Sequence, residues 1–513
     1  MPHFSHSWRS YVLIFLSGLV ASALAINSGS LWADEGIRIY SASKGLWVAA
    51  FGWSCHDKQL FFMLYEWVWS GVFPCTEVGL RSMNIPFFLL AVGYFTLILK
   101  RLNLSPLWAL LMVLHPMVWY YLNDISPYII LLACGTGMLY HLFFAEHPEE
   151  KKHLIAWNLL FLLGFGSHFL FAFCYLLYPV ACVARLRAGE GLAWKRHLAV
   201  GAVFACAYVP LAVLYAAHAV TGDTYGWGYP GLQNVAYVLY GLAGFQGLAL
   251  SRADIRSGLF EHITPAMVAA LAVASLSFLS LVLLNLRALG SLLKTRWVAA
   301  LVVFAVAFAV VAFAVKFQFW ERHYMVLLPA VVILTAQVMS RALARPGLSR
   351  TLSLAAFGTL LLCWLYSGLQ LGFNEYHYKD DYKKVTAYLQ NPENRHRTCP
   401  LLAQGSYFNY SFYGWRCAGL SDSFLRGYGL PMDTLVLLDG TPAPQQMKII
   451  CYVTERYGEA DILLSLRSPQ TRGWEKELER LLVARGFQVS VTQTFNMFKL
   501  LHVQAPLRSS YHF

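Results

Sequence analysis

The chain has 513 residues, of which 58% are hydrophobic and 13% are charged. A soluble domain carries about twice that charged fraction, so the composition argues against a water-soluble enzyme and for a membrane protein. The net charge of +12 is scattered in short clusters with no single basic stripe, which argues against nucleic acid as a partner.

Eleven apolar stretches are long enough, or nearly long enough, to cross about 30 Å of hydrocarbon as helices. They cover residues 11–27, 84–99, 106–122, 127–145, 153–166, 168–184, 198–219, 263–286, 297–315, 323–340 and 351–371. The first run ends in an Ala-Leu-Ala step that resembles a signal-peptidase site, and cleavage there would leave the following loop on the same side.

Basic residues stand in every second connection between these stretches. They are Arg9, Lys100, Arg101, Lys151, Lys152, Arg185, Arg187, Lys195, Arg196, Arg287, Lys294, Arg296, Arg341, Arg345 and Arg350. If those connections are cytoplasmic, the positive-inside rule holds at every crossing. The segments 28–83, 220–262 and 372–513 then face outward. We expect the chain to lie in the plasma membrane, which in a bacterium is the inner membrane.

We therefore predict a polytopic α-helical membrane domain over residues 1–371, with about 11 transmembrane helices and an interfacial outer loop at 28–83. A soluble extracytoplasmic domain of α/β or α+β type is expected at 372–513. Within it, Thr434–Leu438 and Lys448–Val453 have the pattern of strands, and Trp474–Arg485 has the apolar spacing of a helix.

The cysteines provide no C-x-x-C pair and no other zinc-type spacing. Several lie in the segments expected to face the oxidising side of the membrane. On that ground we predict two disulfides, Cys55–Cys75 and Cys399–Cys417.

Ionisable side chains of both signs gather at the outward ends of the predicted spans, whereas the inward connections are almost purely basic. The outward set is Asp34, Glu35, Arg38, His56, Asp57, Lys58, Glu77, Arg81, Asp124, His168, Arg322 and His323. Such groups are costly near lipid and mark functional sites. Carboxylates and cations from at least four connections indicate an acid–base site on the outer face.

The 28–83 loop is the densest part of this set. Two apolar segments, Gly45–Trp53 and Leu60–Phe73, flank its histidine. The second is apolar on most faces, which suits a helix in the membrane interface beside a substrate with a greasy tail.

Several short motifs follow one another along these outer connections. An acidic pair, Asp34 and Glu35, follows the first span, with Arg38 shortly after it. His56–Phe62 then has the histidine, leucine and aromatic residues of an H-P-P-L-Y-Y-type segment, but neither proline.

Further motifs occur at the start of later spans. Glu77 and Arg81 form a Glu-x-x-x-Arg step. Asp124–Tyr128 matches an E-x-R-P-Y step without its arginine, Ser167–Phe169 matches a Thr-His-Tyr step, and Arg322–Tyr324 loosely matches an Arg-Tyr step.

In the order, spacing and shared sidedness of these motifs, the chain resembles the polytopic GT-C glycosyltransferases. The resemblance is to the branch with bacterial protein mannosyltransferases and the lipid A aminoarabinose transferase. It implies transfer of a sugar, with inversion, from a polyprenyl-phosphate donor to a lipid, glycan or protein acceptor, among membrane lipids and without a required cofactor.

The resemblance also implies roles for individual residues. Asp34 would be the general base that deprotonates the acceptor, and Glu35 and His56 would orient the sugar or the base. Cations that stabilise the departing phosphate would come from Lys58, Arg81, His168 and Arg322. Arg38, Asp124 and Tyr324 complete the expected substrate-binding set.

Each of these residues also has a structural interpretation. Asp34 can cap the end of a span, Glu77 and Arg81 can form an ordinary helical ion pair, His168 can end a helix, and Arg322 can anchor a span at the interface. A divalent metal held by Asp34, Glu35, His56 and Asp124 is a minor alternative to a metal-free site.

Two other functions also fit a polytopic chain. A transporter or flippase would explain the spans, but it predicts ionisable groups near mid-span and often a repeat, and the sequence has neither. A non-catalytic scaffold would not need carboxylates and cations that converge from four connections. The sequence names neither the sugar nor the acceptor.

Overall fold

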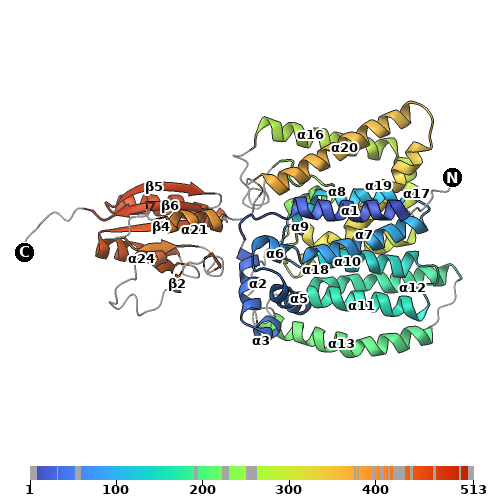
Figure 1. Cartoon of the computed structure of the whole chain (residues 1–513), viewed down its shortest axis with the longest axis horizontal. Helices are drawn as coiled ribbons and strands as arrows, with labels where there is room; N and C mark the ends of the chain where they lie inside the picture. The colour runs from blue at the N-terminus through green and yellow to red at the C-terminus, as the bar shows by residue number, and fades with distance from the viewer. Residues whose placement is uncertain are drawn as a thin grey trace, which may run out of the picture. The chain divides into compact units, whose positions relative to one another are not determined.

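A computed structural model shows the architecture of the chain (Figure 1). The structure describes residues 8–31, 33–51, 59–189, 194–221, 230–249, 263–374, 377, 381–391, 393–394, 399–404, 410, 412–413, 416–419, 434–438, 443–465, 469–495 and 498–506. These residues divide between two compact units. The first comprises Met1–Ser28, Ser41–Ala249 and Thr264–Asn374, and the second comprises Gly29–Tyr40, Leu250–Ile263 and Glu375–Phe513.

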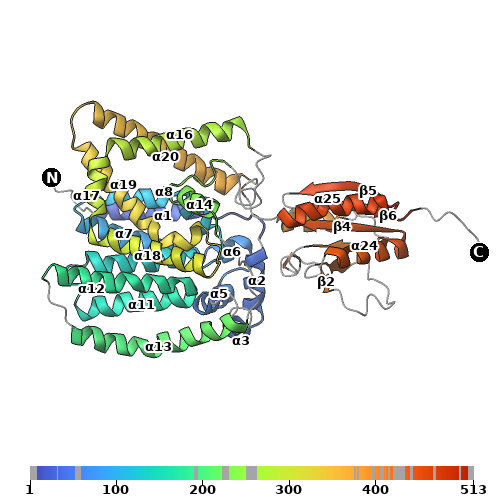
Figure 2. The same ribbon diagram turned by 180° about the vertical axis from the view of Figure 1, so that it is seen from behind.

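The first unit is helical. In chain order its helices are α1 (Trp8–Ala25), α3 (Leu46–Phe51), α5 (Leu60–Val72), α6 (Glu77–Arg81), α7 (Asn84–Arg101), η1 (Pro106–Ala109), α8 (Leu110–Leu114), α9 (Pro116–Leu122), α10 (Tyr128–Leu139), η2 (Tyr140–Phe144), α11 (Lys151–Ser167), η3 (Phe169–Leu176), α12 (Leu177–Arg187), α13 (Trp194–Thr221), α14 (Leu232–Leu242), α16 (Pro265–Leu284), α17 (Leu286–Leu293), α18 (Arg296–Ala314), η4 (Glu321–Leu327), α19 (Leu328–Leu343) and α20 (Leu348–Phe373). Figures 1 and 2 show α1, α7, α10, α11 and α13 running side by side.

Eight helices among the described residues are long and apolar enough to cross a membrane. They are Trp8–Ala25, Glu77–Arg101, Phe169–Arg187, Trp194–Ala216, Pro265–Leu284, Arg296–Ala314, Glu321–Leu343 and Leu348–Phe373. Each coincides with one of the eleven predicted spans. The other three predicted spans are helical as well, over η1 to α9, over α10 and η2, and over α11. The first of these is broken where Pro116 begins α9, because proline suits the first helical turn but breaks a helix interior.

The outer faces of these helices are apolar. Val203 on α13 is 70% exposed, Leu276 on α16 is 63% exposed and Leu362 on α20 is 68% exposed. Side chains of this kind would be strongly unfavourable in water at such density, and a bilayer accommodates them. The chain is therefore a multi-pass membrane protein.

Basic side chains of the first unit meet at one end of its helices. Arg101, at the end of α7, pairs with Glu146 at 3.0 Å, and Arg185, in the last turn of α12, pairs with Glu149 at 3.0 Å. Arg341, in the last turn of α19, donates a hydrogen bond to the Ser291 hydroxyl on α17. The alternation of charge along the sequence thus corresponds to two ends of one helix bundle.

The second unit contains a six-stranded mixed sheet with the strand order β2-β3-β1-β4-β6-β5. The strands are β1 (Leu401–Ala403), β2 (Arg416–Gly419), β3 (Thr434–Leu437), β4 (Glu459–Ser465), β5 (Gln488–Phe495) and β6 (Phe498–Gln504). The first four are parallel to one another, and β6 pairs antiparallel with both β4 and β5. This is the mixed α and β domain that the sequence predicts.

Two separate apolar cores cover the two faces of this sheet. Successive strand residues point to opposite faces, so Ile462 and Leu464 pack in one core while Leu463 packs in the other. The first core also holds residues of α24 (Ala443–Tyr457) and α25 (Pro469–Ala484), and the second holds residues of α21 (Tyr382–Gln390).

One predicted strand is wrong. Lys448–Val453 lies inside the helix α24, whereas Thr434–Leu438 is a strand up to Leu437 and Trp474–Arg485 is a helix up to Ala484. A short run of β-branched residues suggests a strand locally. Over the longer segment, however, Met447, Ile450 and Thr454 are buried at helical spacing, which fixes one face of a helix on the sheet.

The predicted disulfides are also wrong, because Cys75 and Cys399 are both outside any disulfide. Cys55 lies outside the described residues. Cys417 is on β2, and β3 separates this strand from β1, which Cys399 precedes. Two strand spacings amount to about 9.6 Å, which exceeds the separation that a disulfide can bridge.

Candidate functional site

Three connections of the first unit bring polar and aromatic side chains together at the end of the bundle opposite the basic pairs. The helix-end cluster, as we call it, consists of Tyr121, Tyr128, His168, Glu321, Arg322 and His323. The ring of Tyr128 lies 5.8 Å from that of His168 and 6.4 Å from that of His323, and the two imidazoles are 6.0 Å apart. Of the predicted site residues, His168 and Arg322 are thus brought together.

Both histidines of the cluster close the first turn of a 3₁₀ helix. The Nδ1 atom of His168 accepts the Leu170 backbone N–H at 3.2 Å, at the start of η3. The Nδ1 atom of His323 accepts the Trp320 N–H at 3.0 Å, at the start of η4. A neutral imidazole that accepts at Nδ1 carries its proton on Nε2. Each ring therefore presents an N–H donor on its other side.

Arg322 adds a permanent positive charge to these donors. Its guanidinium carbon lies 5.5 Å from the centre of the Tyr128 ring, which is the geometry of a cation–π contact. Its Nε atom is buried and has no hydrogen-bond partner among the residues that the structure describes. Buried, unsatisfied donors are rare in native proteins, and a guanidinium N–H is well suited to bind an anion.

Two serine hydroxyls beside the cluster are in the same situation. Ser126 precedes α10 by two residues and Ser167 directly precedes His168, and both side chains are fully buried. Within the described part of the chain, neither hydroxyl has a hydrogen-bond partner. The connections before α10 and before η3 therefore both carry polar atoms suited to a further ligand.

The acidic member of the cluster is Glu321, which is fully buried. Its Oε1 atom accepts a hydrogen bond from the Tyr121 hydroxyl. Gly241 on α14 lies close to Glu321 and to Gln246 in the loop after α14. A Cβ atom at Gly241 would lie 2.8 Å from Glu321 Cβ and 3.5 Å from Gln246 Nε2. Gln246 is 3% exposed, and neither its amide oxygen nor its amide nitrogen has a partner in the structure.

Asp124 lies in the connection between α9 and α10 and is fully buried. Asn84, at the start of α7, holds this connection through three hydrogen bonds from its amide nitrogen. The acceptors are the backbone oxygens of Tyr121 at 3.2 Å, Leu122 at 3.1 Å and Asp124 at 2.7 Å. The same connection carries Tyr121 and leads into Tyr128, so Asn84 positions two aromatic members of the cluster.

Tyr324 differs from its neighbours because its ring packs in an aromatic core. It lies 5.0 Å from Phe308 and 5.5 Å from Phe319, with only 5% of its surface exposed. Its backbone departs from helical geometry at φ −103° and ψ 15°. Tyr324 directly follows His323 in the sequence, but its ring packs among apolar side chains and not with the cluster.

Arg81 makes contacts that explain it structurally. Its Nη1 atom donates to the backbone oxygen of Asn27 at 2.9 Å. Asn27 in turn donates from its amide nitrogen to Gly372 O at 2.9 Å and from its backbone N–H to Asn123 Oδ1 at 3.1 Å. Arg81 thereby holds the segment that leaves α1.

Asp34, Glu35 and Arg38 lie on α2 (Ala33–Ser43), in the part of this helix that belongs to the second unit. Asp34 is half-buried, Glu35 is fully buried and Arg38 is 4% exposed. The segment before α2 is fixed within its unit, because Lys383 N donates to Ser30 Oγ at 3.1 Å and Leu31 N to the Tyr413 hydroxyl at 2.8 Å. The two carboxylates in the first turn suit the positive end of the helix dipole.

Two predicted site residues, His56 and Lys58, lie outside the described residues. Among the other residues at this site, His323 was part of the outward ionisable set but had no assigned role, and Tyr121, Tyr128, Glu321 and Gln246 were not predicted as site residues. Glu321 and His323 flank Arg322 directly, and Tyr128 completes the Asp124–Tyr128 motif, so adjacency to selected residues was an available signal. Nothing in the sequence marks Gln246.

No protein-family model matches the sequence, and no curated protein sequence matches it. Solved structures do match the fold. The crystal structure of ArnT from Cupriavidus metallidurans in the apo state is 15% identical, with a TM-score of 0.54, over 96% of this chain and 97% of that one. The structure of the same protein bound to undecaprenyl phosphate is 14% identical, with a TM-score of 0.54, over 97% of this chain and 98% of that one. The fold of the chain is therefore that of ArnT, a GT-C enzyme, along nearly its whole length.

Proposed function

We propose that the chain is a membrane glycosyltransferase that moves a sugar from a polyprenyl-phosphate donor to an acceptor. The fold it shares with ArnT supports this proposal, as does the undecaprenyl phosphate bound to one of the ArnT structures. The observation that carries it is the helix-end cluster, where Arg322 has a buried, unsatisfied Nε atom close to two histidines that each present an Nε2–H donor.

A phosphate leaving group explains this arrangement of donors. Charge builds on the phosphate oxygens as the glycosidic bond breaks, and preorganised donors in a water-poor site stabilise that charge best. In the proposal Arg322 provides the charge and His168 and His323 provide directed N–H donors. Lys58 and Arg81 remain candidates for the same task, although the bond from Arg81 to Asn27 already explains Arg81 structurally.

Asp34 is the proposed general base for the acceptor. A half-buried carboxylate next to a fully buried one, Glu35, is suited to accept a proton while its neighbour positions it. Glu35 and His56 would orient the base or the sugar. Arg38, Asp124 and Tyr324 complete the proposed substrate contacts, and inversion at the anomeric carbon follows from a single displacement.

The experiment measures transfer of radiolabelled sugar in membranes that contain the chain, from a panel of undecaprenyl-phosphate-linked hexoses and pentoses. Asp34→Asn keeps the shape of the side chain and removes the proton acceptor, so transfer should fall by about 10²–10⁴-fold. Glu477→Gln is the matched control, because Glu477 is a surface carboxylate that pairs with Arg480 on α25, and it should leave transfer unchanged.

Near-normal transfer by Asp34→Asn would reject this residue as the base. Membranes with the wild-type chain that transfer no more sugar than membranes without it would reject the enzyme altogether. The transporter alternative predicts a different result, namely movement of the labelled donor across liposomes that does not depend on Asp34.

The proposed reaction takes place on the extracytoplasmic face, following the positive-inside rule. The test is labelling of Val483→Cys, an exposed position on α25, with a membrane-impermeant maleimide, in a chain whose exposed Cys75 is replaced by serine. Labelling in intact cells is expected, and labelling only after cell rupture would reverse the orientation.

A further inference from the structure

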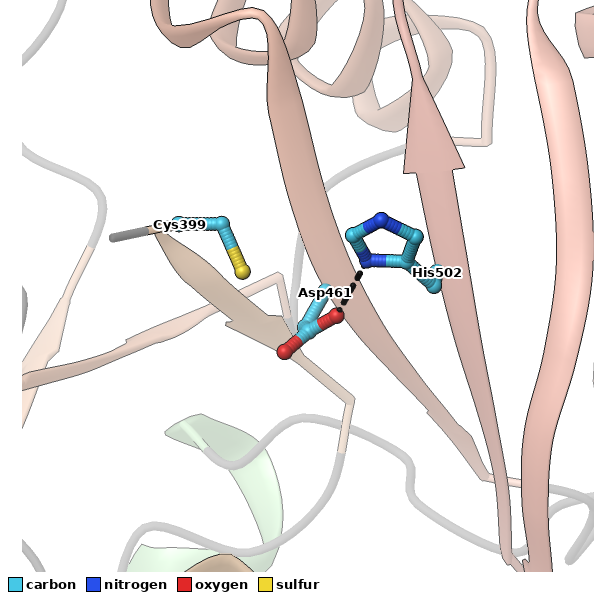
Figure 3. A group of neighbouring side chains, drawn as sticks. All are labelled: Cys399, Asp461 and His502. Carbon is cyan, nitrogen blue, oxygen red and sulfur yellow. Dashed lines mark hydrogen bonds and ion pairs between the residues drawn. The ribbon is translucent and has the colours of Figure 1, made fainter. Parts of the chain in front are cut away.

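The central strands of the second unit bring three metal-ligand side chains to one place (Figure 3). In the sheet register, Asp461 on β4 stands opposite His502 on β6, and Leu401 on β1 is the partner of Asp461 on the other side. Cys399 lies two residues before Leu401. Because alternate strand residues share a face, the three side chains project to the same side of the sheet as Leu463 and Leu500.

The ligand atoms of this group are close enough to share one ion. The Cys399 thiol, an oxygen of Asp461 and a nitrogen of His502 all lie within 4.8 Å of one another. His502 Nδ1 and Asp461 Oδ1 are 2.9 Å apart. In a tetrahedral zinc site with Zn–N of about 2.0 Å and Zn–S of about 2.3 Å, ligand atoms are about 3.3–3.6 Å apart. Small side-chain adjustments therefore suffice.

The burial of Cys399 and Asp461 is unusual for a group that contains a carboxylate. Cys399 is fully buried and Asp461 is 4% exposed. A carboxylate in such a place is costly unless a cation or strong donors accompany it. Thiolate, imidazole and carboxylate together are a ligand set that suits zinc, whereas magnesium and calcium prefer oxygen ligands alone.

A second carboxylate, that of Glu459, lies near the other ring nitrogen of His502. Glu459, two residues before Asp461 on β4, has its Oε2 atom 3.5 Å from His502 Nε2, the ring nitrogen that does not face Asp461. Metal-bound histidines commonly donate their other N–H to a carboxylate, which fixes the tautomer and strengthens the ligand. Nδ1 of His502 therefore faces the other two ligand side chains, and Nε2 faces the carboxylate of Glu459.

We propose that Cys399, Asp461 and His502 bind a zinc ion, with Glu459 orienting the imidazole. Binding releases the thiol proton of Cys399, and His502 offers the lone pair of Nδ1 while its proton stays on Nε2. The ion ties β4, β6 and the segment before β1 together, and its fourth position takes water. This site is independent of the proposed sugar transfer and shares no residue with it.

The test uses the full-length chain purified in detergent, loaded with zinc and separated from excess metal. Metal analysis should find about one zinc ion per chain. Cys399→Ser and His502→Gln should each lower this content to the level of the double variant, and Glu459→Gln should weaken zinc affinity by about 10–100-fold. Cys451→Ser is the matched control: its thiol is buried in the same unit on α24, and burial raises the pKa of that thiol.

Loading with cobalt gives a second readout that does not depend on the variants' stability. Wild-type protein should show the near-ultraviolet charge-transfer band of a thiolate–cobalt bond, and Cys451→Ser should keep it. Wild-type zinc content no higher than that of the double variant would overturn the proposal, as would cobalt bound without a thiolate band. Either result would leave a buried His502–Asp461 hydrogen bond with a packed thiol beside it.

Discussion

At the scale of single residues, the function of the helix-end cluster depends on which nitrogen of each histidine carries the proton. His168 and His323 both accept a backbone N–H at Nδ1. These bonds are local, because each joins residues two or three positions apart in the first turn of η3 or η4. They leave the proton of each ring on Nε2, in two histidines whose rings are 6.0 Å apart and lie near the Tyr128 ring that Arg322 also contacts.

This assignment predicts an order for two substitutions of His168. Glutamine carries its amide nitrogen near the position of Nε2, whereas asparagine reaches only the position of Nδ1. His168→Gln should therefore keep more sugar transfer than His168→Asn, by about tenfold, which corresponds to one neutral hydrogen bond. The measurement is kcat for radiolabelled transfer by folded protein.

The reverse order would mean that the capping bond to Leu170, which asparagine can imitate, is the whole task of His168. As a control, His197→Gln changes a histidine that contacts Tyr178 on α12, away from the cluster, and should not change kcat.

The sequence could identify some of these residues but not their partners. His168 and Arg322 stood out because they are ionisable groups at the ends of apolar stretches. Glu321 is adjacent to Arg322, yet its bond to Tyr121 joins residues 200 positions apart, and nothing local predicts it. Arg81 illustrates the opposite case, since the Asn27 backbone that it binds could not be anticipated from residue type.

At the scale of elements, the connection between α9 and α10 carries much of the site. Asn84 binds three of its backbone oxygens from the start of α7. Asn285 is the comparable buried asparagine on the basic side of the bundle, where it donates to Leu281 and accepts from Arg345. Asn84 positions the connection that carries Tyr121 and Tyr128, whereas Asn285 contacts no residue of the helix-end cluster in these bonds.

We predict that Asn84→Ala lowers the free energy of unfolding by about 1–3 kcal/mol, because it leaves buried carbonyl oxygens without their donor. Thermal unfolding in detergent measures this loss. Transfer per folded molecule should also fall, because Tyr121 and Tyr128 lose their support. Asn285→Ala should destabilise the chain similarly but leave transfer per folded molecule unchanged. Equal activity in the two variants would contradict the positioning role of Asn84.

Elements were predicted well where the apolar pattern was long and less well where it was short. All eleven expected spans are helical because each is an extended apolar stretch that lipid can surround. Lys448–Val453 was assigned wrongly because six residues do not distinguish a buried strand from a buried face of α24. The break at Pro116 follows from a signal that was present in the sequence.

At the scale of the whole molecule, the two ends of the helix bundle differ in chemistry. Ion pairs of Arg101 and Arg185 occupy one end, and the helix-end cluster occupies the other. The alternation of basic residues along the chain contained this division. The identity of the cluster's members did not follow from it, because convergence of α9, α10, α11 and η4 is a tertiary property.

The same limit applies to the second unit. Cys399, Asp461 and His502 are more than 40 residues apart from one another, and the parallel and antiparallel registers of β4 bring them together. Spacing rules for zinc motifs detect ligands that are close in sequence, so they could not detect this group. The mistaken pairing of Cys399 with Cys417 has the same origin.

The proposed function depends on one physical claim, that the helix-end cluster holds the phosphate of a polyprenyl lipid through Arg322. Arg341 lies at the opposite end of the span Glu321–Leu343, which η4 and α19 form, where it donates to Ser291 and provides a matched arginine outside the cluster.

Native mass spectrometry of the purified chain with undecaprenyl phosphate tests this claim most directly. Loss of a charged hydrogen-bond donor costs about 1.5–3 kcal/mol, so Arg322→Ala should bind the lipid about 10–100-fold more weakly than wild type, while Arg341→Ala should bind it normally. Equal binding by wild type and Arg322→Ala would contradict the claim.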